Sequence, residues 1–193
     1  MIYKQSRTKA RRGFTLIETL LAIMILMLAI TGPLTIANKG LTSSLIGKDR
    51  FIATYLAQDA MEYVRFVRDT NALYGVNWLT GVGTNWTTGL SPCYSVGGTT
   101  ACYFDSLGNT PSVITSCANV DCSDVPLYYD TSSNSYSYKK TTGTTQTIFI
   151  RSVKITPVTN NTDEVLVSVT VTWKDVGNVL RTVVDKEDLF YWQ

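Results

Sequence analysis

The most unusual ionisable side chain in the sequence is Glu18, which lies inside an otherwise apolar segment. It is the one charged residue between Phe14 and Ala37, and Leu20 to Ile30 is an unbroken run of Leu, Ala, Ile and Met. A carboxylate in such a segment is energetically unfavourable unless it meets a partner, so its presence indicates a function. The chemistry expected of Glu18 is ion pairing with a cation.

Catalytic chemistry has little basis in this sequence. There is no histidine, which excludes Ser-His-Asp and Cys-His nucleophile pairs and histidine metal ligands. No Ser-Lys or carboxylate pair is arranged for catalysis either. We therefore expect a protein that is not an enzyme and that needs neither a cofactor nor a metal.

The segment that carries Glu18 follows a strongly basic block. The chain of 193 residues has a net charge of only +2, yet five positive charges fall in its first 12 residues and residues 13–193 sum to −3. The basic residues are Lys4, Arg7, Lys9, Arg11 and Arg12. The 24 residues from Phe14 to Ala37 reach about 36 Å as a helix, enough to cross a hydrocarbon core of about 30 Å. The positive-inside rule predicts a cytoplasmic amino terminus and an outward carboxy terminus.

An ordinary secretory signal or signal anchor also has a basic block before an apolar run, and Thr35-Ile36-Ala37 would serve as its cleavage site. Glu18 does not fit that interpretation. The sequence Gly13-Phe14-Thr15-Leu16-Ile17-Glu18, with basic residues before it and the apolar run after it, closely resembles the processing site of type IV prepilins and pseudopilins.

The resemblance implies a sequence of events at this site. A prepilin peptidase would cut between Gly13 and Phe14, removing the leader 1–13, and would methylate the new amino group of Phe14. The carboxylate of Glu18 would pair with the Phe14 amine of a neighbouring subunit and set the register of a filament. The other implied partners are further pilin subunits, the assembly platform of the inner membrane and membrane lipid. Gly32-Pro33 is expected to kink or loosen the helix of residues 14–37.

Residues 38–70 continue the helix as an amphipathic segment with a narrow apolar stripe. The segment 55–65, with an Ala-Gln-acidic-Ala pattern, looks like PilV-like minor pilins and type II secretion pseudopilins. In that class the outer half of the helix packs on its own domain. Arg65 and Asp69 have a spacing that favours an ion pair. The stripe consists of Leu41, Leu45, Ile52, Leu56, Tyr63 and Val67.

Residues 71–193 are expected to form an extracytoplasmic β domain, so the predicted fold is α+β with an antiparallel sheet. Residues 71–110 indicate loops and short strands. Alternation predicts strands over 146–156 and 165–173, and the turn at 175–178 leads to a hairpin partner at 179–184. The aromatic tail 189–192 is expected to cover the sheet.

The four cysteines lie in this outer domain, where disulfides are the expected state. They are Cys93, Cys102, Cys117 and Cys122. Three connectivities are possible, and pairing Cys93 with Cys102 and Cys117 with Cys122 closes the shortest loops. A zinc site would prefer C-x-x-C spacing, which is absent.

Two other segments could bind ligands, and simpler interpretations are favoured for both. Asp130–Tyr136 resembles the start of a calcium loop but lacks its glycine and final acid, so a β-turn is preferred. Lys139-Lys140 in a net-acidic domain is weak evidence for nucleic acid, a partner expected only of a DNA-uptake pilus.

The sequence therefore predicts a minor pilin of a type IV pilus-like filament, held first as a single-pass membrane precursor and then displayed outside the cell. The alternative within this class is a type II secretion or DNA-uptake pseudopilin, which has the same leader, cleavage motif and apolar helix. The alternative of another class is an anchored adhesin or binding domain that never polymerises.

Overall fold

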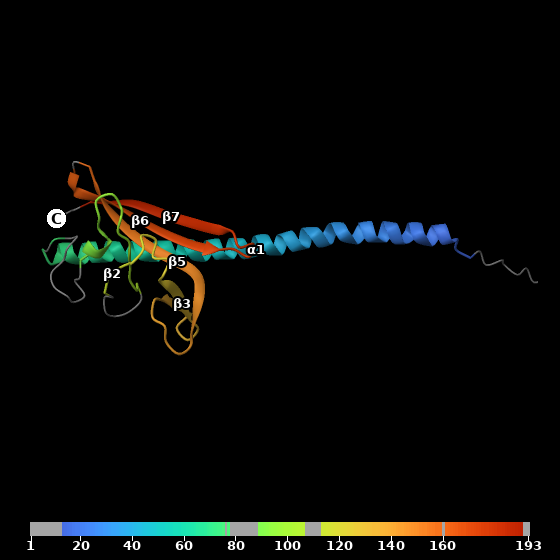
Figure 1. Cartoon of the computed structure of the whole chain (residues 1–193), viewed down its shortest axis with the longest axis horizontal. Helices are drawn as coiled ribbons and strands as arrows, with labels where there is room; N and C mark the ends of the chain where they lie inside the picture. The colour runs from blue at the N-terminus through green and yellow to red at the C-terminus, as the bar shows by residue number, and fades with distance from the viewer. Residues whose placement is uncertain (1–12, 76, 78–88, 107–112, 160, 191–193) are drawn as a thin grey trace, which may run out of the picture. The chain divides into compact units, whose positions relative to one another are not determined.

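The computed structural model describes residues 13–75, 77, 89–106, 113–159 and 161–190. The chain divides into two compact units, Met1–Ser44 and Leu45–Gln193. The helix α1 (Leu16–Leu73) belongs to both units, and every strand lies in the second. Among the described residues, a 3-10 helix and seven strands follow α1 (Figure 1): η1 (Ser91–Cys93), β1 (Cys102–Tyr103), β2 (Thr115–Ser116), β3 (Pro126–Asp130), β4 (Ser135–Ser137), β5 (Thr144–Val158), β6 (Asn161–Lys174) and β7 (Leu180–Phe190).

The strands form one antiparallel sheet built around β5. One side of β5 pairs with β6, which pairs in turn with β7. The other side pairs with β1 at Val153 and with β3 between Thr144 and Ile150, and β2 and β4 extend β1 and β3. The α+β architecture predicted from the sequence is confirmed. The apolar residues at every second position of β6 are all buried: Val165, Val167, Val169, Val171 and Trp173.

The carboxy-terminal part of α1 covers this sheet, and β5, β6 and β7 lie alongside it in Figure 1. The helix face in the core is wider than the predicted stripe, because it includes small residues such as Ala53, Ala57 and Ala60. Leu41 and Leu45 belong to the predicted stripe but are 67% and 48% exposed. The buried helix residues are Ala53, Leu56, Ala57, Ala60, Met61, Tyr63, Val64, Val67 and Asn71.

The carboxy-terminal hairpin is also longer than expected. Asp175 organises the turn by accepting the N–H groups of Gly177 at 2.8 Å and Val179 at 3.0 Å. Leu189 and Phe190, predicted to start a covering tail, are instead the end of β7, with Leu189 buried and Phe190 51% exposed. Tyr191 and Trp192 lie outside the described residues, as do Trp78 and Trp86.

The polar segment after Asp130 forms the turn between β3 and β4, as the sequence favours. The Asp130 carboxylate accepts the Ser132 N–H at 2.8 Å and the hydroxyls of Ser132 and Ser133 at 2.7 and 3.0 Å. Its oxygen atoms therefore stabilise the turn itself, and these hydrogen bonds lower the pKa of Asp130.

Candidate processing and assembly site

The proposed scissile bond lies just before the first residue of α1, outside the helix. Gly13 and Phe14 precede the first helical residue, Leu16, and both are exposed, Phe14 by 80%. Thr15 caps the helix: its carbonyl accepts the N–H groups of Glu18 and Thr19 at 3.1 and 3.2 Å, and its hydroxyl accepts that of Glu18 at 3.3 Å. The Gly13–Phe14 bond thus lies in accessible, non-helical backbone. The leader residues 1–12 lie outside the described residues.

Glu18 occupies the third position of the first helical turn, where a negative charge is favourable beside the free N–H groups. Thr15 and Glu18 have the spacing of a capping box. The Glu18 residue is exposed, and its carboxylate has no hydrogen bond or ion pair with any residue that the structure describes. Glu18 is therefore available to a partner as far as the described part of the chain is concerned.

The amino-terminal half of α1 exposes its apolar side chains on all sides. Its large side chains from Leu16 to Ile36 are at least 54% exposed, and α1 is the one described helix long and apolar enough to cross a membrane. The hydroxyls in this stretch are internally satisfied: Thr31 donates to the Met27 carbonyl and Thr35 to the Gly32 carbonyl, both at 2.7 Å. The helix α1 continues through Pro33 in the single chain. The kink or loosening expected at this position stays a prediction.

A family model described as the prokaryotic N-terminal methylation motif matches residues 8–32. The chain has the amino terminus of a type IV pilin-like prepilin. The match spans the end of the basic leader, the proposed cleavage point, Glu18 and the first part of the apolar run. Searches of curated proteins and of solved structures gave no match. The motif thus implies processing by a prepilin peptidase and assembly with other pilins, and it does not extend to the sheet domain.

Two disulfides crosslink the sheet domain of this pilin-like chain. Cys93 bonds to Cys102 and Cys117 to Cys122, the short-loop pairing that the sequence favours. The first bond ties η1 to β1, and the second closes the loop after β2. Since all four sulfur atoms are in disulfides, none is available as a thiolate ligand for zinc.

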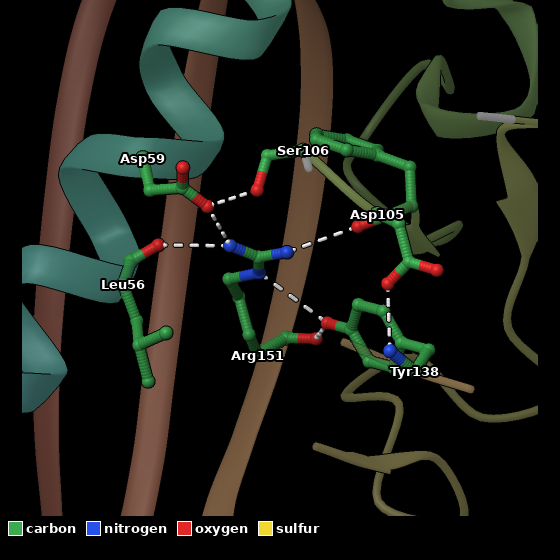
Figure 2. Close-up of polar contacts among 7 residues, drawn as sticks. Leu56, Asp59, Asp105, Ser106, Tyr138 and Arg151 are labelled. Atoms are coloured by element: carbon green, nitrogen blue, oxygen red, sulfur yellow. Dashed lines mark hydrogen bonds and ion pairs between the residues drawn. The ribbon is translucent and has the colours of Figure 1, made fainter. Parts of the chain in front are cut away.

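A buried arginine joins α1 to the sheet. Arg151 projects from β5, and its side chain is only 3% exposed. The guanidinium donates to the Asp59 carboxylate at 2.8 Å and to the Leu56 carbonyl at 3.1 Å (Figure 2). It also donates to the Phe104 carbonyl at 2.9 Å. The Tyr138 hydroxyl donates to the Arg151 carbonyl at 3.1 Å and accepts from its Nε at 3.3 Å. One side chain therefore connects α1, β5, the loop after β1 and the segment after β4.

The charges in this cluster are set by burial and by its partners. Burial by itself opposes the Arg151 cation, but the interactions with Tyr138 and Asp59 outweigh it, and the pKa of Arg151 is raised. Burial also raises the pKa of Tyr138, which keeps its phenol neutral at physiological pH. The cluster therefore contains a buried Arg151 cation paired with Asp59, with the neutral phenol of Tyr138 beside it.

Arg65 makes a second link between helix and sheet. The sequence favours an Arg65–Asp69 pair, but Arg65 instead binds Glu62 on α1 and Glu187 on β7, and Asp69 pairs with Arg68 at 2.8 Å. The hydrogen bond from Arg65 to Glu187 is the main cause of the raised pKa of Arg65. Arg65 thus pairs with Glu187 of β7 and not with Asp69, the partner predicted on the helix itself.

Proposed function

We propose that this chain is a structural subunit of a type IV pilus-like filament, inserted in the membrane as a prepilin and polymerised through the amino-terminal half of α1. One observation carries the proposal: the amino-terminal part of α1, up to residue 37, exposes an apolar surface, and the prepilin motif at residues 8–32 includes the first part of that surface. The carboxy-terminal part of α1 instead packs on its own domain. A surface of this kind is unstable in water and is covered by lipid before assembly and by other subunits afterwards.

Cleavage prepares the helix for this second state. A cut at Gly13–Phe14 leaves the apolar segment on the mature protein and creates an α-amine four residues before Glu18. Because the Glu18 carboxylate has no partner among the described residues of the single chain, it is free to pair with the Phe14 amine of a neighbour. In low dielectric, a paired carboxylate and amine are strongly favoured over two separate charges.

The two disulfides support a location of the sheet domain outside the cytoplasm, because such bonds persist in oxidising compartments. The basic leader supports the same orientation. The assembly platform of the inner membrane and the lipid bilayer are therefore the further proposed partners. We also propose that the chain catalyses no reaction itself, in keeping with the absence of histidine.

Within this function, a minor pilin with PilV-like character is the proposed subtype, on the strength of the Ala-Gln-acidic-Ala pattern at residues 57–60. The same pattern fits a type II secretion pseudopilin. Deletion of the gene separates the two functions: loss or shortening of surface fibres supports the pilus, and retention of a secreted protein inside the cell supports the secretion system.

The experiment that tests polymerisation is Glu18→Ala, with Glu18→Gln as its matched control for shape. Filaments sheared from cells are probed for this protein, and membranes are probed for cleaved and uncleaved forms. We expect both variants to be cleaved and both to be missing from filaments, because neither retains the negative charge. Normal incorporation of Glu18→Ala contradicts the assembly role. Absence of the wild-type protein from every filament favours an anchored domain that does not polymerise.

A further inference from the structure

A groove of about 610 Å³ lies between α1 and β7 in the second unit. Helix residues form one wall, and Asp185 and Glu187 of β7 form the other. Because side chains alternate along a strand, these two residues point to one face of β7 while Lys186 and Asp188 point to the opposite face. The helix residues that line the groove are Tyr55, Gln58, Asp59, Met61, Glu62 and Arg65.

The groove is acidic after its internal ion pairs are counted. The Asp59 carboxylate is turned toward Arg151 and is neutralised by it, as Figure 2 shows. Glu62, Asp185 and Glu187 remain against the single guanidinium of Arg65 in the groove lining, which leaves a net charge of −2.

The helix face beside the groove is also apolar and uncovered. Phe51, Tyr55 and Phe66 are 75%, 57% and 49% exposed, although they flank the best-packed part of α1. With Gln58 and Glu62, they recur every three or four residues and therefore share one side of the helix. Exposed aromatic side chains around a charged groove are typical of a surface that another protein covers.

The same chain carries a matching basic feature a short distance earlier on α1. Lys48 and Arg50 are exposed and have no ion-pair partner among the residues that the structure describes. Asp49, between them, is half-buried, and its charge adds to burial and to Tyr129 in raising the pKa of Tyr136. Lys48 and Arg50 project to different sides of the helix. A neighbouring copy can therefore direct one of the two toward the groove at several rotations about its own helix axis.

We propose that the α1–β7 groove is a docking site for the basic turn Lys48–Arg50 of a second copy of this chain. This inference rests on the proposed filament function and on two copies of this chain being neighbours in the filament, whichever subtype it is, and it adds the identity of one contact between them. Glu62 lies 12 to 14 residues beyond the basic turn, so two copies in contact are displaced along the helix axis by about 18–21 Å. The contact lies in the outer half of α1 and is separate from the Glu18–Phe14 pair.

Photo-crosslinking in intact cells tests the contact. A benzoylphenylalanine replaces Gln58, which lines the groove and is exposed, and a second variant carries it at Asp188, on the opposite face of β7. We expect the Gln58 position to give a covalent dimer of this chain with its adduct between residues 45 and 51, and the Asp188 position to give none. An adduct on another protein, or on another part of this chain, overturns the inference.

Reversing the charge of a groove residue provides a second test of the contact. Asp185→Lys is expected to lower the yield of the Gln58 dimer by about five- to tenfold, which corresponds to loss of one or two favourable charge contacts. Asp188→Lys makes the same change of charge outside the groove and is expected to leave the yield unchanged. Adding Lys48→Glu and Arg50→Glu to Asp185→Lys should restore the dimer. Equal effects of Asp185→Lys and Asp188→Lys refute the groove contact.

The outcomes distinguish this inference from the proposed function. If the wild-type chain is present in filaments but the groove variants behave like their controls, only the groove contact fails. If the chain enters no filament and forms no dimer, the proposed function fails as well. Melting temperatures of the purified variants show whether each still folds. Folding is expected because the Asp185 carboxylate makes no hydrogen bond with any residue that the structure describes.

Discussion

Replacing Arg151 by methionine should destabilise the sheet domain more than any exposed charge substitution. Methionine keeps much of the side-chain length and removes the guanidinium. The Phe104 carbonyl then loses the guanidinium donor, and the Asp59 carboxylate, whose side chain is 24% exposed, loses its counter-charge. Breaking a buried ion pair by removing one partner costs about 3–5 kcal/mol, and the partial exposure of Asp59 places this case near about 3 kcal/mol.

Thermal unfolding of the detergent-solubilised mature chain, followed by tryptophan fluorescence, measures this loss. At about 2–4 °C per kcal/mol for a domain of this size, the midpoint should fall by about 6–12 °C. Lys174→Met, an exposed charge removal on β6, is the matched control and should change the stability by no more than about 0.5 kcal/mol.

A double variant tests the physical reason for the loss. If Arg151→Met is costly because it leaves the Asp59 charge without a partner, then Arg151→Met with Asp59→Leu should be more stable than Arg151→Met alone. Strict additivity of the two substitutions, or a cost of Arg151→Met below about 1 kcal/mol, would refute the role of Arg151 as the link between α1 and the sheet.

Three further predictions concern the sheet domain. Hydrogen bonds from the backbone N–H of Val179 and from Arg181 lower the pKa of Asp175. The Asp175 carboxylate therefore contributes its full stability above about pH 4, and this contribution is lost as the pH falls through the lowered pKa of Asp175. Melting curves from about pH 7 to pH 2 should show that decline in the wild type and a smaller one in Asp175→Ala. Replacing both Cys93 and Cys102 by alanine removes a crosslink over nine residues and should cost about 2–3 kcal/mol by denaturant unfolding, and an unchanged midpoint would contradict this. Gly98 has a φ of +66°, and a Cβ there would lie 3.3 Å from the Thr156 methyl, so Gly98→Ala should destabilise the domain by about 1–2 kcal/mol in the same assay.

The long strands could be predicted from the sequence because their physical cause is local. In β6 every second residue from Val165 to Trp173 is apolar, and a strand buried on one face satisfies that pattern. The turn at Asp175 is local in the same way, since the carboxylate binds N–H groups two and four residues later. The disulfides of the structure are the short-loop pairing, one of three connectivities that the sequence leaves open.

The polar links between α1 and the sheet could not be predicted, because their partners are far apart in the sequence. Asp59 and Arg151 are separated by 92 residues, and Arg65 and Glu187 by 122. In the sequence Arg151 is one of two cations in the β5 segment, with Lys154, and no spacing rule connects it to a helix acid. The buried alanines of α1 were missed for another reason: an alanine is compatible both with a helix face that packs closely and with one that faces solvent.

The amino-terminal site was recognisable because its residues form one continuous segment. Gly13, Phe14 and Glu18 are held close together by the chain itself, so a short motif is sufficient to identify them. The proposed partner of Glu18 belongs to a different molecule, and neither the sequence nor the fold of one chain contains it.

Intact-mass analysis of the protein extracted from cell membranes tests the central claim most directly. The prepilin assignment predicts a mature chain of 180 residues, because removal of residues 1–13 from the 193 leaves Phe14 as the first residue. This chain should carry one added methyl group and be four hydrogen atoms lighter than its fully reduced form, because it contains two disulfides. A chain that begins at Asn38 would show that a secretory signal peptidase removes the apolar segment, and it would contradict the assignment of that segment to filament assembly.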